Sequence, residues 1–515
     1  MLSREQLAVV TGIVNTDRNL LVCGIAGSGK TYVLNVALSR LNLSSSELFV
    51  TAMTGKAADI IEGETLHFIA GLGRICLNDT LETVLTRIGS NYPALSRIKT
   101  MKLLVIDEVS LLSDHVFTIL EQVLRTLRGN CLPFGGVRIC LIGDFLQLPP
   151  VVDSKSAAQS SEIDLETVKA NSYCFNSPVW ESLDPIAFYL RTSQRAKDPQ
   201  LSGIIEALSE GRMNVPVFEA RKAKIDFEKF FDGSNAGGKM VITTTVSRAA
   251  GVNCLMLGKN SSRLHFQCSD TFTSEDTTTQ NALLSQVSLK EKVTVTRSSR
   301  IMFLKMSTVL AATDLRKENA ESKKLVVRNG TLGTVVGFAS REIVEKRSAR
   351  VGLVGRFPPR SSAPNIEAQK ANLDWYAVEI KLDCGLYIHA ALEEEIVTGP
   401  NHETLRRLQV PFVLSYAATA HKCQGSTFEK VHIAVSDDQL FEREHFYVMV
   451  SRVRRLQDLS IDEVVNLSNV PVGPREEVRQ FYSRMFPQEE FIWTRCEQKP
   501  HKLLGQKRDA GEIDG

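Results

Sequence analysis

Short aliphatic runs alternate with helical stretches over the first third of the chain. The runs are LLVC (20–23), LFVTA (48–52), LLVI (103–106) and VRICLI (137–142). Each of them ends at a polar or glycine-rich turn. This alternation predicts a mostly parallel sheet with helices on both faces. Sheets of that kind bind ligands beyond the carboxyl ends of their strands, so the turns are the first places to look for chemistry.

A second block with the same alternation of aliphatic and helical stretches starts at VITTTV (241–246). It resumes with FVLSYAATA (412–420), VHIAV (431–435) and a helix near 442–454. The stretch between its halves, roughly 300 to 405, is rich in irregular β-forming sequence. Within that stretch, Asn329-Gly330 separates two apolar runs and predicts a β-hairpin. We therefore expect a small β domain inserted into a second α/β domain. The polar stretches 153–164 and 232–238 are predicted loops, and the last residues a disordered tail.

Composition sets limits on these expectations. A chain of 515 residues, 43% hydrophobic and 23% charged, is globular and long enough for several domains. No apolar run reaches the roughly 18 to 20 residues that cross a bilayer, so we expect a soluble intracellular protein without membrane partners. Ten scattered cysteines without CxxC pairs favour reduced core thiols over zinc ligands. The net charge of +2 means that any nucleic-acid contact depends on local positive charge.

The segment GIAGSGKT fits the phosphate-loop pattern GxxxxGK[ST], with a strand before it and an apolar-periodic helix after it. Its glycines allow the backbone N–H groups and the helix N-terminus to face phosphates. Lys30 is expected on the β- and γ-phosphates and the Thr31 hydroxyl on Mg²⁺. The predicted nucleotide-binding residues are Gly24, Ile25, Ala26, Gly27, Ser28, Gly29, Lys30 and Thr31.

Carboxylates and an amide follow the next strands. Asp107 and Glu108 end the buried run LLVIDE, the Walker B arrangement, in which Asp107 binds Mg²⁺ and Glu108 activates the attacking water. The alternative, a plain acidic helix N-terminus, is less compatible with the preceding phosphate loop. A kinase would share these features. The segment CLIGDFLQLPPV then places Asp144 and Gln147 where a side-chain amide can sense the γ-phosphate.

The motif series as a whole resembles that of the Pif-type DNA helicases, in the RecD-like branch of superfamily one. The resemblance extends from about Ser3 to Ile461. Besides the phosphate loop and Walker B strand it rests on LSREQ (2–6), TAMTGKAADIIEGETLHFIAGLG (51–73), PFGGVRICLIGDFLQLPPV (133–151), LRTSQRAKD (190–198), YAATAHKCQGSTFEKVHI (416–433) and FYVMVSRVRRLQDL (446–459). Ala196, Cys423 and Met449-Val450 depart from the commoner family pattern but remove no phosphate-binding side chain.

The resemblance implies an α/β P-loop NTPase with two RecA-like parallel-sheet domains, a small wedge subdomain and an inserted SH3-like β domain. The implied ranges are 1–185 for the first RecA-like domain with a wedge near 74–100, 186–300 and 409–470 for the second, 301–408 for the SH3-like domain, and 471–515 for a C-terminal extension and tail. ATP and Mg²⁺ would bind in the cleft between the RecA-like domains.

The resemblance also assigns roles to residues on both sides of that cleft. The first domain would supply Lys30, Thr31, Asp107, Glu108 and Gln147, and the second Arg195 and Arg452. Arg452 is the expected arginine finger. An arginine in this role typically raises the turnover rate by a factor of ~10³ to 10⁵. Gln6 is expected to read adenine, and Gly425 to add a nucleotide contact.

Single-stranded DNA is the implied partner, with a fork or tailed duplex as the unwinding substrate and a monomeric motor. The candidate DNA contacts are Thr54, Thr65, His67, Thr419, His421 and Gln424. For the two histidines the alternative is a packed buried ring, and Lys56 is equally a DNA contact or a solvated helix lysine. The basic stretch 341–362 either contacts phosphates or only solubilises a loop.

We therefore expect an ATP-dependent 5′-to-3′ DNA helicase that acts in DNA replication, recombination, repair or telomere and genome maintenance. We expect it at the nucleus or site of DNA replication in a eukaryotic or viral setting, and otherwise in the cytoplasm. The direction of movement comes from the resemblance alone. Two alternatives remain open. One is a single-strand translocase that remodels protein–DNA complexes without processive unwinding. The other is the motor part of a transposition system.

Overall fold

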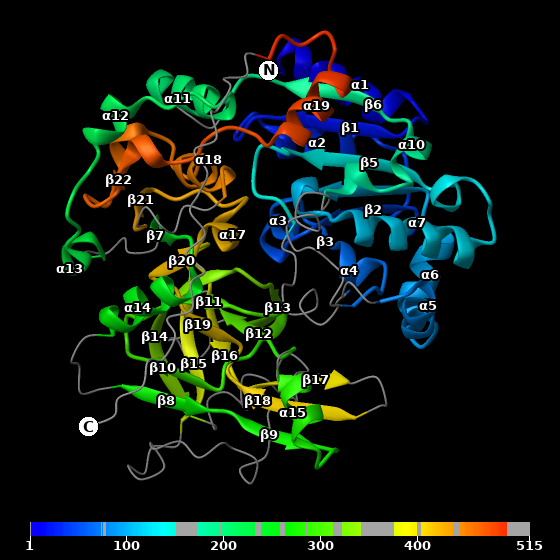
Figure 1. The fold of residues 1–515 in the computed structure, drawn as a ribbon. Coiled ribbons are helices and arrows are strands. Elements are labelled where there is room, and N and C mark those ends of the chain that lie inside the picture. The colour runs from blue at the N-terminus through cyan, green and yellow to red at the C-terminus, as the bar shows by residue number, and fades with distance from the viewer. Residues whose placement is uncertain are drawn as a thin grey trace, which may run out of the picture.

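Three bodies make up the protein in the computed structural model: two parallel sheets with their helices, and an antiparallel β region below them (Figure 1). The structure describes residues 2–73, 75, 79–150, 173–194, 198–231, 238–257, 263–284, 286–312, 322–340, 375–398, 403–435 and 442–491. Two α/β units with an antiparallel β insertion match the predicted fold class.

The first sheet has six parallel strands in the order β3-β2-β4-β5-β1-β6. They are β1 (Leu20–Gly24), β2 (Leu48–Ala52), β3 (Glu64–Thr65), β4 (Leu103–Asp107), β5 (Arg138–Gly143) and β6 (Ile186–Leu190). Every residue of β1 and β4 is buried, as expected for strands covered by helices on both faces. Because β5 pairs with both β1 and β4, the turns that follow these three strands open side by side.

The α-helices of this unit among the described residues are α1 (Arg4–Asn15), α2 (Lys30–Leu38), α3 (Gly55–Ile60), α4 (Leu66–Ile69), α5 (Leu81–Gly89), α6 (Tyr92–Thr100), α7 (Asp114–Arg128) and α10 (Trp180–Leu183). A capping box fixes the start of α1, since Ser3 and Gln6 satisfy each other's backbone N–H groups. Helices α5 and α6 occupy most of the predicted wedge range. Their apolar faces, including Val84 and Ile98, join the same core as α7.

The predicted boundary of the first domain at residue 185 is wrong. Strand β6 pairs in parallel with β1, from Leu20 opposite Ile186 to Gly24 opposite Leu190. The prediction failed because IAFYL lies after a gap in the series of motifs, and its local sequence does not indicate which sheet it joins.

The second sheet has four parallel strands in the order β20-β7-β21-β22. They are β7 (Lys239–Thr243), β20 (Ala417–Thr419), β21 (Lys430–Ile433) and β22 (Leu459–Ile461). The associated helices are α11 (Pro199–Ser209), α12 (Val215–Glu219), α13 (Phe227–Phe231), α14 (Val246–Met256), α17 (Ala420–Cys423) and α18 (Glu444–Val450). The predicted strands at 241–246 and 431–435 correspond to β7 and β21. The predicted strand at 412–420 is correct only in its second half, β20, because residues 412–414 form a strand that pairs with the antiparallel region.

The antiparallel region is larger than the predicted range 301–408. Its seven-stranded sheet has the order β13-β12-β16-β15-β14-β11-β19, and two smaller sheets, β17-β18-β9 and β10-β8, pack beside it. The strands are β8 (Leu264–Gln267), β9 (Ser269–Phe272), β10 (Lys292–Val295), β11 (Arg300–Phe303), β12 (Ser307–Ala312), β13 (Ser322–Val327), β14 (Leu332–Ser340), β15 (Trp375–Leu382), β16 (Tyr387–Ala390), β17 (Glu393–Thr398), β18 (Thr404–Gln409) and β19 (Phe412–Leu414). The helix α15 (Thr277–Leu284) lies among them. The insertion therefore begins before residue 301 and ends after 408.

The hairpin predicted at Asn329-Gly330 is also wrong. A turn is present and Gly330 has φ +88°, but β13 pairs with β12 whereas β14 pairs with β15 and β11. The turn residues are correct for a tight reversal. The pairing differs because the partners of both strands come from elsewhere in the insertion.

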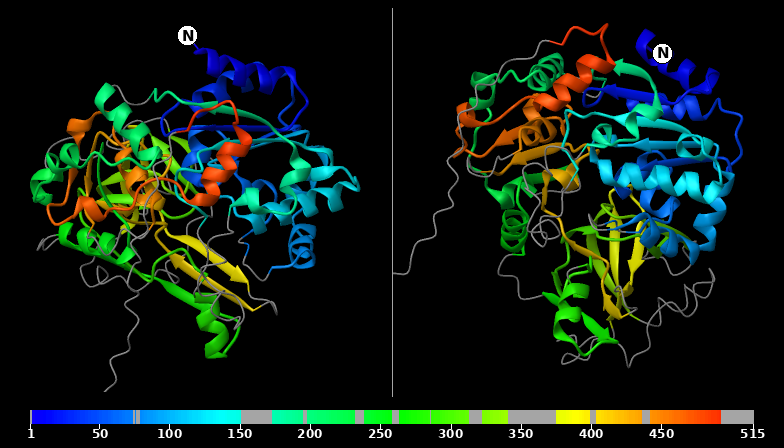
Figure 2. Two further views of the ribbon diagram at one scale, coloured as in Figure 1. Left: turned by 45° about the horizontal axis from the view of Figure 1, so that its top comes forward. Right: turned by 45° about the vertical axis from the view of Figure 1, so that its right-hand side comes forward.

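The helix α19 (Glu476–Met485) returns the chain to the first unit, beside β6 (Figure 2). Phe481 stacks on Phe175 at 4.1 Å between ring centroids, and Tyr482 meets Tyr189 of β6 edge to face at 5.8 Å. The predicted C-terminal extension therefore contains an ordered helix that completes the core of the first unit.

Cysteine burial agrees only in part with the expectation of core thiols. Four described cysteines are buried (Cys23, Cys140, Cys174 and Cys423), whereas Cys131, Cys254 and Cys384 are exposed. Among the described residues, no helix has the length and apolar character that a membrane crossing requires. The predicted loop 153–164, the basic stretch 341–362 and the tail from 492 onward lie outside the described residues, as does 232–238 apart from Gly238.

Candidate functional site

A cavity of about 340 Å³ lies where the two parallel-sheet units meet, and both units line it. The first unit contributes the phosphate loop from Ala26 to Thr31, the carboxylates Asp107 and Glu108, and Gln147. The second contributes Gly425, Thr427 and Arg452. The structure thus brings together in one cavity most of the residues that the sequence predicts for nucleotide binding and catalysis.

The phosphate loop connects β1 to α2, and its glycines make that connection possible. Gly29 has φ +88° at the start of α2, a conformation that side chains disfavour. A Cβ added at Gly24 would lie 2.6 Å from the carbonyl oxygen of Leu190. The Lys30 ammonium donates to the carbonyls of Gly24 at 2.7 Å and Ile25 at 3.2 Å. Lys30 is therefore held inside the loop, where a bound phosphate would replace these carbonyls.

The two carboxylates stand at the end of β4. The Asp107 carboxylate accepts the Glu108 backbone N–H at 2.8 Å. Burial, and then the negative charge of Glu108, raise the pKa of Asp107 to about 7. Glu108 itself has φ +55°, an uncommon conformation for a non-glycine residue that aims its side chain into the cavity. Two carboxylates and the Thr31 hydroxyl lining one cavity are hard oxygen ligands of the kind that suit Mg²⁺.

Asp144, just after β5, anchors the third segment of the site. Its buried carboxylate accepts hydrogen bonds from the Gln147 amide at 3.3 Å and from the Tyr447 hydroxyl at 2.8 Å. Burial raises the pKa of Asp144. The hydroxyl of Tyr447, on α18, also accepts the Ala26 backbone N–H at 2.7 Å. One tyrosine of the second unit therefore contacts both the phosphate loop and the carboxylate that orients Gln147.

Arg452 is almost fully buried, and hydrogen bonds hold its guanidinium in place. Its Nε donates to the carbonyl of Val448 at 2.8 Å, one Nη to the carbonyl of Ser426 at 3.2 Å, and the other Nη to the hydroxyl of Ser451 at 2.7 Å. Burial lowers the pKa of Arg452. Because α18 and its flanking turn fix the guanidinium at the cavity wall, Arg452 presents a pre-positioned positive charge from the second unit.

Gln424 occupies a different place from the one predicted. Its amide nitrogen donates to the Glu108 carboxylate at 3.1 Å and to the Ser110 hydroxyl at 3.2 Å, and only 2% of the residue is exposed. A buried amide that contacts Glu108 is not placed to touch DNA, so the predicted DNA contact at Gln424 is wrong. Its position links Glu108 to the segment that carries His421 and Thr419.

Two predicted residues lie beside the cavity. The Gln6 amide donates to the carbonyl of Ser28 at 3.3 Å, so Gln6 packs on the phosphate loop. Arg195 lies outside the described residues. Its neighbour Gln194 lines the cavity and donates its backbone N–H to Gly27 at 2.7 Å. The residues up to Gln194 follow β6 of the first sheet. They therefore belong to the first unit and not, as expected, to the second domain.

The candidate DNA contacts of the first unit follow β2 and β3. The hydroxyls of Thr54 and Thr65 cap α3 and α4, accepting the backbone N–H groups of Ala57 and Phe68. Each hydroxyl keeps its own proton to donate. His67 is partly exposed, and burial lowers its pKa.

The candidates of the second unit follow β20. Thr419 is 8% exposed and begins α17, and the His421 ring meets the buried His445 edge to face at 5.7 Å. Burial lowers the pKa of His421. Both sets of candidates therefore lie at the carboxyl edges of their sheets.

Tyr447, Gln194 and Thr427 belong to the site, but the sequence reasoning missed them. All three lie inside segments that the sequence singled out, one to five residues from a predicted contact. The local sequence did not indicate the role of Tyr447, because that role depends on a contact with Asp144, more than 300 positions away in the chain.

Known proteins resemble this chain in sequence. The sequence model of the PIF1-like helicases matches residues 1–214. The ATP-dependent DNA helicase PIF1 of Emericella nidulans is 25% identical over 99% of this chain and 66% of its own length. The ATP-dependent DNA helicase RRM3 of Saccharomyces cerevisiae is 27% identical over 94% of this chain and 68% of its own length.

Solved structures agree with the fold. The Pif1 helicase from Candida albicans superposes with a TM-score of 0.72 at 22% identity, covering 94% of this chain and 99% of that structure. The Pif1 helicase from Bacteroides, in complex with ADP-AlF3 and single-stranded DNA, gives a TM-score of 0.69 at 22% identity over 95% and 98% of the two chains. Residues 1–214 thus match the PIF1-like helicase family, and the chain as a whole is similar to Pif1 helicases in sequence and in fold.

Proposed function

We propose that this protein is an ATP-dependent DNA helicase that moves 5′ to 3′ along single-stranded DNA and separates duplexes. The observation that carries the proposal is the shared cavity. Lys30, Asp107 and Glu108 come from one parallel sheet and Arg452 from the other. Such a split site ties nucleotide binding to the relative position of the two units.

In the proposed mechanism, Lys30 holds the β- and γ-phosphates of ATP and Glu108 orients the attacking water. Asp107 and Thr31 would hold Mg²⁺, which neutralises the phosphate charge. Arg452 supplies the second positive charge only when the units are closed. Binding and loss of the γ-phosphate then favour closed and open arrangements in turn, which is the basis of movement.

Gln424 supplies the proposed connection to DNA. It reaches Glu108 from a turn that also carries His421 and Thr419, both at the edge where the strand would lie. A shift of that turn when DNA binds would change the orientation of the catalytic carboxylate. Stimulation of ATP hydrolysis by DNA is the expected consequence.

The relatives support the substrate class. Their names specify ATP-dependent DNA helicases, and related Pif1 structures contain single-stranded or forked DNA. For this chain we propose the same cofactors, ATP and Mg²⁺, the same DNA partners, and a role in replication, recombination or repair. The chain covers 49% to 68% of the first three relatives, so their full activities are part of the proposal.

The test compares the wild-type chain with Lys30→Ala on duplexes that carry a single-stranded tail at either end. We expect ATP hydrolysis that rises with added single strand and unwinding only of the 5′-tailed duplex. Lys30→Ala should lose both while keeping its thermal stability. Unwinding by Lys30→Ala, or a preference for the 3′-tailed duplex, would contradict the proposal. Hydrolysis and movement without strand separation would instead support the translocase alternative.

A further inference from the structure

The C-terminal helix α19 contacts the nucleotide-binding cavity indirectly, through a residue that does not line it. Tyr482, in the second half of this helix, is fully buried. Its hydroxyl accepts the Phe145 backbone N–H at 3.2 Å and donates to the Asp144 carboxylate at 3.4 Å. Asp144 also accepts the Gln147 amide, so a single residue separates Tyr482 from the side chain expected to sense the γ-phosphate.

Asp144 has two tyrosine partners, one on each carboxylate oxygen. Tyr482 donates to Oδ1, whereas Tyr447 donates to Oδ2 at 2.8 Å. The Gln147 amide shares Oδ2 at 3.3 Å, and the Leu146 backbone N–H shares Oδ1 at 3.1 Å. All of these residues are buried, so the direction of the carboxylate depends on protein contacts and not on bulk water. A carboxylate without one tyrosine hydroxyl would turn more freely and would take the Gln147 amide with it.

The start of α19 contacts the second unit. Arg475, which precedes the helix, donates through Nε to the Glu444 carboxylate at 3.2 Å and pairs through Nη2 with Glu442. Glu444 is buried and is the first residue of α18, the helix that carries Tyr447 and ends shortly before Arg452. Burial raises the pKa of Glu444 to about 7, and the charge of Arg475 opposes that rise. The ion pair therefore fixes the start of α18 against the start of α19.

The rest of α19 is anchored in the aromatic core of the first unit. Phe481 stacks on Phe175 at 4.1 Å and meets Phe145 edge to face at 5.2 Å. The helix is thus attached to the first unit by its apolar face and to the second by Arg475. Because Tyr447 and the expected arginine finger come from α18 and the turn after it, α19 relates the groups that the two units contribute to the site.

We propose that α19 is a positioning element for ATP hydrolysis. Tyr482 orients Asp144 and, through it, the Gln147 amide. Arg475 holds α18 in the place that this arrangement requires. Neither Tyr482 nor Arg475 lines the nucleotide cavity, so both act through other residues. The inference rests on the proposed function, because it requires that the cavity hydrolyses ATP.

The first experiment compares Tyr482→Phe with Tyr189→Phe, which removes a hydroxyl from a neighbouring ring of the same core. Steady-state ATP hydrolysis at saturating single-stranded DNA gives kcat and KM. In Tyr482→Phe we expect kcat to fall roughly three- to ten-fold, the effect of one long hydrogen bond. The KM for ATP should stay within about two-fold of the wild type, because Lys30 and the phosphate loop are intact. Tyr189→Phe should change kcat by less than about two-fold.

Two nucleotide probes separate positioning from general stability. ADP occupies the cavity without a γ-phosphate, whereas ADP with aluminium fluoride supplies a mimic of the transferred phosphoryl group. Tyr482→Phe should bind the fluorescent analogue mant-ADP as the wild type does, and should lose roughly three- to ten-fold in affinity once aluminium fluoride is added. A purely structural effect would lower the melting temperature and weaken both complexes alike.

The contact with α18 is tested by Arg475→Gln, and by Arg475→Lys, which keeps the charge. Arg484→Gln is the matched control, because it removes an exposed ion pair with Glu181 from the same helix. We expect Arg475→Gln to lower kcat at an unchanged KM, Arg475→Lys to recover part of that loss, and Arg484→Gln to have no effect. Combined with Tyr482→Phe, Arg475→Gln should lose less than the product of the two single losses, because both residues act on one arrangement. A loss equal to that product would contradict a shared arrangement.

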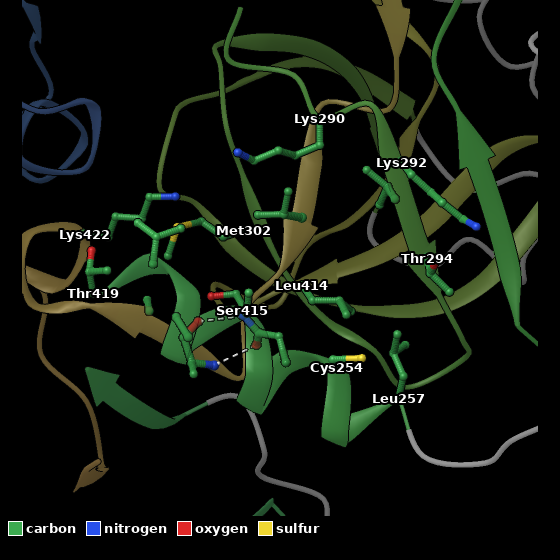
Figure 3. Close-up of a pocket in the computed structure, with 18 residues that line it drawn as sticks. Cys254, Leu257, Lys290, Lys292, Thr294, Met302, Leu414, Ser415, Thr419 and Lys422 are labelled. Atoms are coloured by element: carbon green, nitrogen blue, oxygen red, sulfur yellow. Dashed lines mark hydrogen bonds between the residues drawn. The ribbon is translucent and has the colours of Figure 1, made fainter. Parts of the chain in front are cut away.

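DNA affinity provides an internal control. A second cavity, of about 310 Å³, lies between the second parallel sheet and the antiparallel region, and Lys290, Lys422 and the candidate DNA contact Thr419 line it (Figure 3). None of its described lining residues comes from α19. Without nucleotide, Tyr482→Phe should therefore bind a fluorescein-labelled oligothymidylate as tightly as the wild type does. A loss of DNA affinity as large as the loss of kcat would count against the inference.

The possible results separate the inference from the proposed function. An unchanged kcat in Tyr482→Phe, or equal losses of affinity for mant-ADP with and without aluminium fluoride, would overturn the inference while wild-type hydrolysis persists. Equal losses of kcat in Tyr482→Phe and Tyr189→Phe would do the same, because packing and not the hydroxyl would then matter. A wild-type chain that does not hydrolyse ATP would overturn the proposed function and the inference together.

Discussion

The Tyr447 hydroxyl donates a hydrogen bond of 2.8 Å to the Asp144 carboxylate, across the boundary between the two parallel-sheet units. The same hydroxyl accepts the Ala26 backbone N–H of the phosphate loop at 2.7 Å. Both partners are buried, so neither can exchange this contact for water without a penalty. The helix that precedes Arg452 is thereby connected directly to the phosphate loop.

Replacing Tyr447 with phenylalanine should therefore weaken the site without removing a phosphate ligand. The variant leaves a buried N–H and a buried carboxylate short of a partner, which costs about 1 to 3 kcal/mol. We expect slower ATP hydrolysis and a lower unfolding temperature. Tyr189→Phe, in the same hydrophobic core, is the control and should change both less. Equal effects of the two substitutions would indicate that packing, not the hydroxyl, matters.

Gln424→Ala should separate basal from DNA-stimulated hydrolysis. The amide donates to the Glu108 carboxylate, and hydrogen bonds to charged groups contribute about 1.5 to 3 kcal/mol. We expect roughly a ten-fold or larger loss of stimulated turnover, and a greater loss in Gln424→Glu, which sets a second carboxylate against Glu108. The measurement is ATP turnover with and without single-stranded DNA. Gln480→Ala, at an exposed position of α19, is the control.

The antiparallel region is attached to the first unit by Arg328. Its guanidinium pairs with Asp59 and, at 3.0 Å, with Glu64, while a Cβ at Gly55 would lie 3.0 Å from the Asn329 carbonyl oxygen. This turn therefore lies directly against α3, next to the candidate DNA contact Thr54. It also packs on the side chain of Lys56.

Arg328→Gln should loosen that attachment. Dyes placed on the exposed Cys131 of the first unit and Cys384 of the antiparallel region would report the separation by energy transfer. The background would carry serine in place of the remaining cysteines that are not buried among the described residues (Cys76, Cys254, Cys268 and Cys496). We expect a broader and longer distance distribution in Arg328→Gln. Arg406→Gln removes an ion pair with Glu394 that lies within the antiparallel region and should change nothing. Identical distributions in all three proteins would show that the ion pair does not hold the contact.

The second sheet should lose stability in mild acid through His432. The ring is buried on β21, with Nδ1 3.0 Å from the Ser460 hydroxyl and with Asp462 and Arg248 as its charged neighbours. Burial lowers the pKa of His432 to about 4, against 6.5 when unfolded. Because the unfolded chain takes up the proton first, stability is full above pH 6.5 and falls as the pH drops towards 4.

The size of that loss follows from the shift, at about 1.4 kcal/mol per unit of pKa, or roughly 3 kcal/mol in all. The measurement compares the pH dependence of unfolding of the wild type with that of His432→Gln between pH 4 and 7. The difference between the two proteins should narrow as the pH falls. A constant difference across this range would show that the pKa of His432 is the same in the folded and the unfolded chain.

Local sequence determined much of this protein. The strand–loop–helix around Lys30, the carboxylates after β4 and the turn after β5 follow from patterns a few residues long, since backbone conformation and the order of apolar positions are local properties. The fold class and the candidate phosphate-binding residues could therefore be predicted from the amino-acid sequence. The membership of β6 in the first sheet could not be predicted, because the local sequence of a strand does not specify which strand it pairs with.

Tertiary structure decided the relations between distant segments. Gln424 contacts Glu108 and not a surface, Asn329-Gly330 meets α3 and not a hairpin partner, and Lys290 and Lys422 share a pocket although more than 130 positions separate them. The sequence determined which chemical groups are available and which local turns present them. Which groups meet was decided by packing, because contacts between segments far apart depend on how whole sheets and helices bury their apolar faces.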